Sequence, residues 1–361
     1  MPDPRVERYA ELLVDTCVGV QDGWQVVVTG SPLARPLLEA IARLLGERGA
    51  YAIVRVNLSG AFGLPDLQWV LAAPEARLGE LAPIDRHMFE NADAIVSVYA
   101  PENARDASAV SEKRLQLVHQ ASRPVLDRIV TGGLPWVGCQ YPCPSLAQEA
   151  EMSVREFEDF LYGAVLLDWD EERRKMEKVA ARFDAAEEVR IVGAGTDLRL
   201  SLAGRRGEVD AGGANMPGGE VFYSPVEDSA EGTIAFTEFP ALYAGRSVEG
   251  IRFRFEGGRI VDASADRHEE FLLETLDADE GARRLGELGI GCNPGITRHM
   301  RNALFDEKMY GTVHLAIGSG FPYLGGTNES SVHWDIVKDL RDGGELYCDG
   351  ELVQRGGEWR F

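Results

Sequence analysis

The sequence predicts two domains, an α/β domain over residues 1–185 and a β-rich α+β domain over residues 186–361. Three observations lead to this prediction. The chain has 361 residues, which is long for one hydrophobic core. Strand and helix patterns alternate in the first part, whereas short strands separated by turns follow in the second. Between them, residues 168–188 form an acidic and basic run typical of a solvated helix that leads out of a domain.

The first domain is expected to contain a parallel sheet. Its predicted helices are residues 5–18 and 31–49, and its predicted strands are residues 24–30, 50–58 and 92–100. Ser31 is placed to start the second helix and Gly49 to stop it. Strand, helix and strand at this spacing predict parallel strands joined by crossover helices, in a flavodoxin-like or Rossmann-like layer.

A longer helical stretch closes the first domain at residues 145–183. Within it, Ser153 and Glu156 have the spacing of a capping box. The predicted strands of the second domain are residues 189–195, 198–202, 232–239, 251–263 and 311–320, with a hairpin turn at 256–259. Helix signals in this part fall mainly at residues 266–288. The segment 193–198 lacks the third glycine of a dinucleotide-binding fingerprint, so no such site is expected there.

Charge and cysteine content limit the function classes. A net charge of −22 argues against nucleic acid or an anionic membrane as a partner, because both require a basic surface. Five scattered cysteines, an odd number, argue against a disulfide framework and are expected to be reduced thiols. Neither a signal peptide nor a membrane span is recognisable. The expectation is a soluble cytoplasmic protein.

Two histidines lie in patterns that favour more than a surface role. His333 and Asp335 are two residues apart in the apolar run SSVHWDIV, so a strand would place both side chains on one face. Such a pair is either hydrogen-bonded at a sheet surface or binds a metal. His314 lies in a second apolar strand pattern, TVHLAIG, where an unpaired imidazole would be costly to bury.

Two isolated glutamates extend this set. Glu220 follows a Gly-Gly turn and precedes an aromatic strand. Glu287 is expected in the last turn of a helix, where a carboxylate is unfavourable unless a cation compensates it. Each glutamate alone is more often a surface residue than a ligand. Together the two histidines and three carboxylates form a mixed nitrogen and oxygen set suited to Zn²⁺, Co²⁺ or Mn²⁺. Three carboxylates suit two ions bridged by one carboxylate, as in two-metal hydrolases.

Six segments in order resemble one family, the thermophilic-type metalloaminopeptidases of the aminopeptidase T and aminopeptidase S group. They are residues 143–162, 195–205, 215–225, 285–296, 302–322 and 325–337. The resemblance implies a cytoplasmic exopeptidase and homodimer acting on peptides with a free N-terminus. It also implies two divalent ions per subunit, whether zinc, cobalt, manganese or magnesium. The family's metal ligands fall on Glu220, Glu287, His314, His333 and Asp335.

The sequence departs from the family at one position. A tyrosine that assists catalysis commonly precedes the proline of the GxxYP segment, but here the segment is GSGFP and Phe321 takes that place. Tyr323, two residues on, is the candidate for a catalytic hydroxyl from a shifted position, with a packing role as the alternative.

Three functions follow from these residues. The first is a metal-dependent aminopeptidase. The second is a ring-cleaving dihydroxypyridine dioxygenase of similar fold, with one iron held by His314 or His333 and Asp335. Five candidate ligands are more than one iron needs and argue against this alternative, whereas the Phe321 departure keeps it open. The third is a binding protein that has lost turnover, to which the intact ligand set gives little support.

Overall fold

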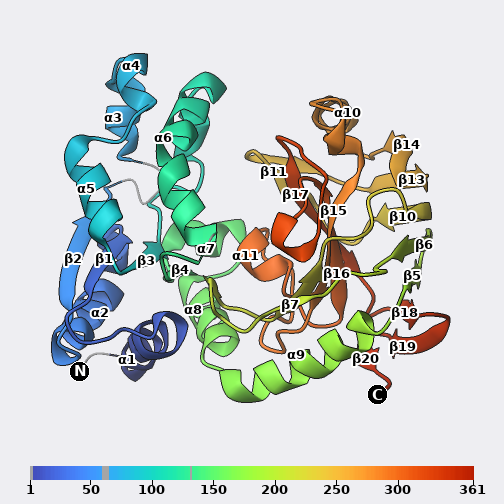
Figure 1. Cartoon of the computed structure of the whole chain (residues 1–361), viewed down its shortest axis with the longest axis horizontal. Helices are drawn as coiled ribbons and strands as arrows, with labels where there is room; N and C mark the ends of the chain where they lie inside the picture. Colours follow the sequence, from blue (N-terminus) through green and yellow to red (C-terminus); the bar gives the residue numbers. More distant parts are fainter. Residues whose placement is uncertain (1–2, 59–64, 131) are drawn as a thin grey trace. The chain divides into compact units, whose positions relative to one another are not determined.

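The computed structural model describes residues 3–58, 65–130 and 132–361 (Figure 1). The chain divides into two units, each with more contacts inside it than to the rest. The first comprises residues 1–166 and 212–218, and the second comprises residues 167–211 and 219–361. Helix α9 (Trp169–Asp184), expected to lead out of the first domain, belongs to the second unit.

The first unit contains the predicted parallel sheet. Its strand order is β2-β1-β3-β4-β8, and every pair is parallel. The strands are β1 (Gln25–Gly30), β2 (Tyr51–Val56), β3 (Ala94–Tyr99), β4 (Trp136–Gln140) and β8 (Asn215–Met216). Val26, Val27 and Val28 of β1 are fully buried, as expected for a strand inside a sheet covered by helices. The α/β prediction is confirmed.

Helices connect these strands. They are α1 (Pro4–Glu11), α2 (Arg35–Glu47), α3 (Leu67–Ala72), α4 (Glu75–Leu78), α5 (Pro83–Asn91), α6 (Glu112–Val130), α7 (Pro144–Glu149) and α8 (Val154–Val165). A π-helical stretch, Leu12–Val18, continues α1 over the rest of the expected helix. The predicted capping box begins α8: Glu156 N–H donates to Ser153 Oγ over 3.3 Å, and Ser153 N–H donates to Glu156 Oε2 over 2.8 Å.

The second unit contains two larger antiparallel sheets and a small one. The eight-stranded sheet has the order β14-β13-β10-β6-β5-β18-β19-β20. Its strands are β5 (Glu188–Gly193), β6 (Thr196–Ser201), β10 (Glu231–Phe236), β13 (Ile251–Glu256), β14 (Arg259–Ser264), β18 (Glu345–Cys348), β19 (Glu351–Arg355) and β20 (Glu358–Trp359). Gly257 and Gly258 form the predicted hairpin turn. Strands β11 (Ala241–Tyr243) and β12 (Arg246–Val248) pair with each other.

The five-stranded sheet of this unit carries the candidate metal ligands. Its order is β17-β16-β15-β9-β7. The strands are β7 (Glu208–Asp210), β9 (Glu220–Tyr223), β15 (Leu285–Gly291), β16 (Thr312–Gly318) and β17 (His333–Asp339). Two short helices, α10 (Glu269–Leu276) and α11 (Ala303–Asp306), complete the unit.

The prediction that Glu287 lies in the last turn of a helix is wrong. Helix α10 ends at Leu276, and Glu287 lies instead in β15, which pairs with β16 on one side and β9 on the other. All seven residues of β15 are buried. Pairing on both edges satisfies the backbone of this glycine-rich segment, and that tertiary context overrides the local helical pattern.

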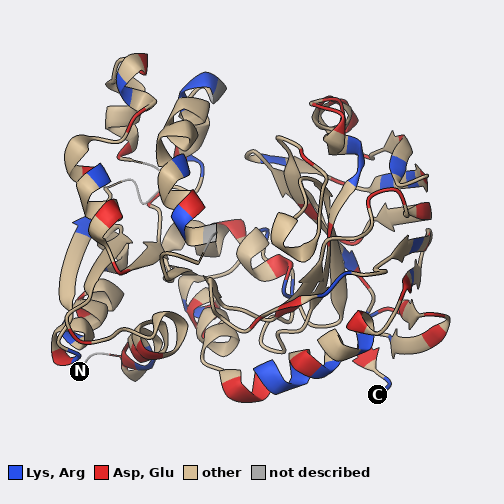
Figure 2. Ribbon diagram, in the orientation of Figure 1, with Lys and Arg blue, Asp and Glu red and all other residues tan. Residues whose placement is uncertain are grey.

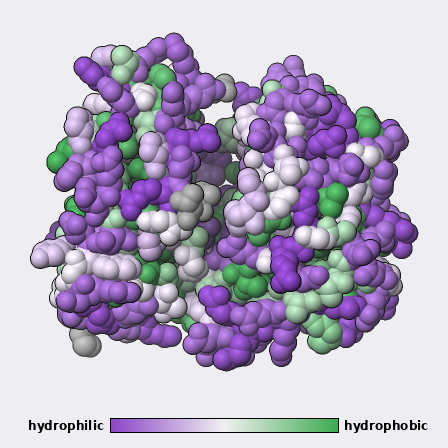
Figure 3. All heavy atoms as spheres, viewed as in Figure 1, coloured by the Kyte–Doolittle hydropathy of each residue, from purple (hydrophilic) through white to green (hydrophobic). Residues whose placement is uncertain are grey.

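The surface agrees with the composition. Figure 2 shows acidic and basic residues along α9, where Lys175 pairs with Glu171 and Glu172. Hydrophilic side chains predominate on the face drawn in Figure 3. All five cysteines are free thiols, and four of them are buried. Among the described residues, no helix combines the length and apolarity needed to cross a membrane.

Candidate metal centre

The register of the five-stranded sheet places the predicted ligands on one face. In antiparallel strands, directly opposed residues point to the same side. Asp335 opposes Ala316, which opposes Glu287 across the next pair of strands. His314 opposes Gly289 on β15. The remaining two oppose glycines, Glu220 with Gly291 and His333 with Gly318. Small residues opposite the ligand side chains therefore leave room for them on this face.

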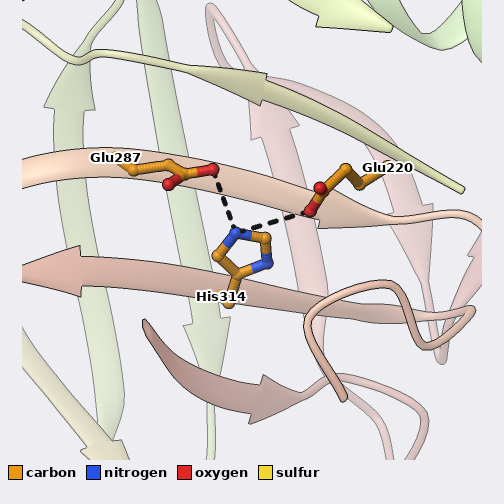
Figure 4. Close-up of side chains that lie close together, drawn as sticks. All are labelled: Glu220, Glu287 and His314. Carbon is orange, nitrogen blue, oxygen red and sulfur yellow. Dashed lines mark hydrogen bonds and ion pairs between the residues drawn. The ribbon is translucent and has the colours of Figure 1, made fainter. Parts of the chain in front are cut away.

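Three of these side chains form a first donor group (Figure 4). Glu220, Glu287 and His314 come from β9, β15 and β16 and point toward one another. His314 Nε2 is 3.2 Å from Glu287 Oε1 and 3.7 Å from Glu220 Oε2. All three residues are buried, so the group lies in a low-dielectric environment where charges interact strongly.

Glu287 also belongs to a second donor group, with His333 and Asp335. His333 Nε2 is 3.3 Å from Glu287 Oε2 and 3.7 Å from Asp335 Oδ1. In each group the candidate ligand atoms lie within 4.8 Å of one another. Glu287 thus turns one carboxylate oxygen toward each histidine. The structure brings all five predicted residues together.

Main-chain carbonyls orient both histidines. His314 Nδ1 is 2.9 Å from the carbonyl of Glu307, and His333 Nδ1 is 2.9 Å from that of Ser319. A carbonyl only accepts, so each Nδ1 carries the proton that it donates. Each Nε2 consequently faces the carboxylates, in the arrangement by which outer hydrogen bonds orient histidine ligands in metal sites.

Burial and the contacts among these five side chains shift their pKa values. Burial opposes ionisation of Glu287, but hydrogen bonds from His314 and His333 outweigh it and lower its pKa to about 2. Burial also opposes protonation of the two histidines, yet contact with Glu287 raises the pKa of His314 to about 10 and that of His333 to about 9. Burial raises the pKa of Asp335 to about 6 and also raises that of Glu220.

Two buried carboxylate oxygens test whether this cluster suits a cation. Glu220 Oε2 and Asp335 Oδ1 have no hydrogen-bond partner within the described part of the chain. Leaving a charged acceptor buried and unpaired is costly. One such oxygen belongs to each donor group, beside a histidine Nε2. Three carboxylates and two imidazoles are donors that divalent transition ions accept, so the residues fit a pair of such ions.

Sequence reasoning missed one charged residue at this site. Lys308 is fully buried, and its Nζ lies 2.9 Å from Glu220 Oε1 and also contacts Glu307. Burial opposes its charge, but Glu220 and Glu307 raise its pKa. In sequence it stands in a polar stretch after α11, where a solvated lysine is the ordinary outcome. Nothing local marks it as buried.

Phe321 and Tyr323 lie beside the second donor group. The Phe321 ring is 5.5 Å from that of His333 and 5.3 Å from that of Phe222. Its backbone N–H donates to Ser224 Oγ over 2.8 Å, which ties this turn to the segment after β9. The Tyr323 ring packs 5.7 Å from that of Phe321, and Tyr323 is 56% exposed. The part of the Tyr323 side chain that is buried, together with the charge of Glu208 and a hydrogen bond to it, raises the pKa of the Tyr323 hydroxyl.

The comparison with known families decides which class of metal site this is. The model of the thermophilic metalloprotease family, M29, matches residues 2–359. The chain belongs to this family. Membership confirms the prediction of an enzyme that uses a metal to hydrolyse peptides.

Relatives and solved structures agree with M29 membership. Aminopeptidase AmpS of Bacillus subtilis is 29% identical, over 99% of this chain and 98% of its own. Aminopeptidase T of Thermus thermophilus is 29% identical, over 98% of each. The structure of wild-type AmpT from Thermus thermophilus matches with a TM-score of 0.85 and 25% identity over 99% of both chains, which confirms the predicted fold class.

A second solved structure shares the fold alone. The 2,5-dihydroxypyridine dioxygenase of Pseudomonas putida KT2440 matches with a TM-score of 0.62 and 17% identity, over 98% of this chain and 96% of its own. At that identity the likeness says nothing of the chemistry. The M29 relatives are more similar to this chain in sequence and in structure.

Proposed function

We propose that this M29 protein is an aminopeptidase that removes N-terminal residues from peptides with two divalent ions. The observation that carries the proposal is the pair of donor groups that share Glu287. Each donor group contains three residues. Five side chains are enough for both groups, because Glu287 belongs to each of them. A single iron would use only one of the two donor groups and leave the other without an ion, which disfavours the dioxygenase.

The residues divide between the two ions as the donor groups do. Glu220, Glu287 and His314 would hold one ion, and Glu287, His333 and Asp335 the other. The donor set suits Zn²⁺, Co²⁺ or Mn²⁺, and its carboxylates also accept Mg²⁺. When bound, the ions supply Lewis acidity and lower the pKa of a coordinated water toward neutrality.

The side chains then move the proton. Hydrolysis joins the water oxygen to the carbonyl carbon, breaks the peptide C–N bond and delivers a proton to the leaving amine nitrogen. A carboxylate oxygen of Glu220 or Glu287 takes the proton from the water and returns it to that nitrogen. The hydroxyl of Tyr323 is the proposed donor to the oxyanion, because Phe321 has no hydroxyl to offer.

Substrate and setting follow from charge and cysteine chemistry. A peptide with a free, positively charged N-terminus suits a protein with a net charge of −22, and nucleic acid and membranes do not. Free thiols suit the cytoplasm. Following the family resemblance, we also propose a homodimer.

Removing and restoring the metal tests the proposal. The protein is stripped with a chelator and titrated with Co²⁺ or Zn²⁺, while release from an unblocked leucyl anilide is followed and an N-acetylated copy serves as the control. Recovery should saturate near two ions per subunit, with the acetylated substrate inert. Full activity after chelation would contradict a metal-dependent reaction. Ion uptake without release, together with oxygen uptake on a dihydroxypyridine, would favour the dioxygenase.

A further inference from the structure

Lys308 is the only lysine among the contacts of the first donor group, within the described residues, and it is 0% exposed. Its Nζ lies 2.9 Å from Glu220 Oε1 and 4.0 Å from Asp210 Oδ2, and it also hydrogen-bonds Glu307 Oε1. An ammonium removed from water requires such partners, because an unpaired buried charge is strongly destabilising. Lys308 thus neutralises part of an acidic cluster.

The two oxygens of Glu220 have different environments. Oε1 is occupied by Lys308. Oε2 is buried, has no hydrogen-bond partner in the described structure and lies 3.7 Å from His314 Nε2. A carboxylate otherwise binds an ion through one oxygen or through both. With Oε1 held by the ammonium, only Oε2 is presented to the donor group.

We propose that Lys308 is a positioning residue, which makes Glu220 a one-oxygen ligand of the ion in the first donor group. This inference rests on the proposed function, since it assumes that the two donor groups bind ions. It predicts that Lys308 acts on one of two ions, because neither His333 nor Asp335 is among its contacts. Loss of a residue that orients a metal ligand typically weakens metal binding 10- to 100-fold.

The chain offers a matched control. Lys338, on β17, is also 0% exposed, and its Nζ binds a carboxylate, Glu238 Oε1, over 2.5 Å. Along β17 the residues alternate in burial: Lys338 lies on the well-buried face, and the less buried His333 and Asp335 lie on the other. Replacing either lysine with methionine keeps most of the length of the side chain and removes its charge, so both variants leave a carboxylate without its ammonium partner.

The experiment measures Co²⁺ binding to the full-length, ion-free protein by calorimetry and by the visible absorption of bound Co²⁺. For Lys308→Met, one of the two Co²⁺ ions should bind 10- to 100-fold more weakly while the other is unchanged. The spectrum of the weakened site should also change, because Glu220 becomes free to bind through both oxygens. Lys338→Met should bind both ions as the wild type does.

The outcomes separate this inference from the proposed function. Unchanged binding of both ions to Lys308→Met would overturn the inference, as would an equal loss in Lys338→Met. If the wild type binds only one ion, the two-ion proposal is wrong. The positioning role of Lys308 then stands if Lys308→Met weakens binding of that ion, and falls if binding is unchanged. Should circular dichroism show Lys308→Met unfolded, Lys308→Gln replaces it with the same expected loss.

Discussion

Glu287 links the two donor groups through the separate contacts of its carboxylate oxygens. Oε1 faces His314 and Oε2 faces His333, at 3.2 and 3.3 Å. When no ion is bound, both histidines are protonated, and their positive charge balances the negative charge of Glu287. A ligand nitrogen must instead offer a lone pair, so cation and proton compete for the same atoms.

This competition predicts a pH dependence of metal binding. The pKa of His314 is about 10 and that of His333 about 9, so both are protonated at pH 7 before an ion binds. Binding therefore expels these protons, and the apparent affinity should rise as the pH rises from 7 toward 9. Calorimetry in two buffers of different ionisation enthalpy measures the released protons. Binding without proton release at pH 7 would contradict this assignment.

Tyr323 is the residue on which turnover is expected to depend. Tyr323→Phe should lower kcat by tenfold or more without changing metal content, because a donor to the oxyanion contributes about 10²–10³ in rate. Phe321→Tyr in that background should restore part of the loss. Tyr347→Phe is the control, since that hydroxyl also binds a glutamate, Glu345, but on β18. An unchanged kcat in Tyr323→Phe would leave Tyr323 a packing role only.

At the residue scale, type and spacing selected the two histidines and Asp335, whereas Glu287 was selected for a helix position that it does not occupy. His333 and Asp335 share a face of β17 as the i, i+2 rule requires. Lys308 could not be selected, because its burial depends on carboxylates contributed by other segments of the chain. His299 stacks 4.7 Å from the Phe239 ring, a contact between distant segments that its charged sequence neighbours do not indicate.

At the element scale, β15 shows how a strand makes space for a ligand on its neighbour. Gly289 directly opposes His314, and a Cβ at Gly289 would lie 1.9 Å from His314 Cε1. The imidazole of His314 therefore occupies the volume that the Cβ of any residue other than glycine would fill at position 289. The absence of a side chain is what admits the histidine to the sheet face.

Gly289→Ala should consequently displace His314. We expect a loss of stability of about 1–3 kcal/mol from overpacking, together with at least tenfold weaker Co²⁺ binding. Gly46→Ala in α2 is the control, because a Cβ there meets no atom within 4 Å and alanine favours a helix. Thermal unfolding and Co²⁺ titration check both variants. Wild-type Co²⁺ binding by Gly289→Ala would contradict the register argument.

Elements with a clear period or cap were predictable from the sequence. The hydrophobic run of β1 and the capping box of α8 appear where expected. Strand β15 was not, because its Leu-Gly-Glu-Leu segment also fits the last turn of a helix. The segment is a strand because it pairs with β9 and β16, whose residues lie elsewhere in the sequence.

At the scale of the whole molecule, every candidate ligand belongs to the second unit. An ion that binds only the folded state stabilises the part that holds it. Added Co²⁺ should therefore slow amide hydrogen exchange in β9, β15, β16 and β17, with little change in β1 to β4. Exchange mass spectrometry with and without chelator measures this. Equal protection of both sheets would contradict the assignment.

The path of the chain between the units has a further consequence. Residues 212–218 leave the second unit and supply β8, the fifth strand of the first unit's sheet, just before β9 and Glu220 begin. No single break in the gene separates one unit from the other. A fragment ending at residue 166 lacks an edge strand, and a fragment starting at residue 167 carries that strand without its partner β4. Exchanging the first unit between proteins would therefore require three junctions, after residues 166, 211 and 218, and the last of them lies two residues before the candidate metal ligand Glu220.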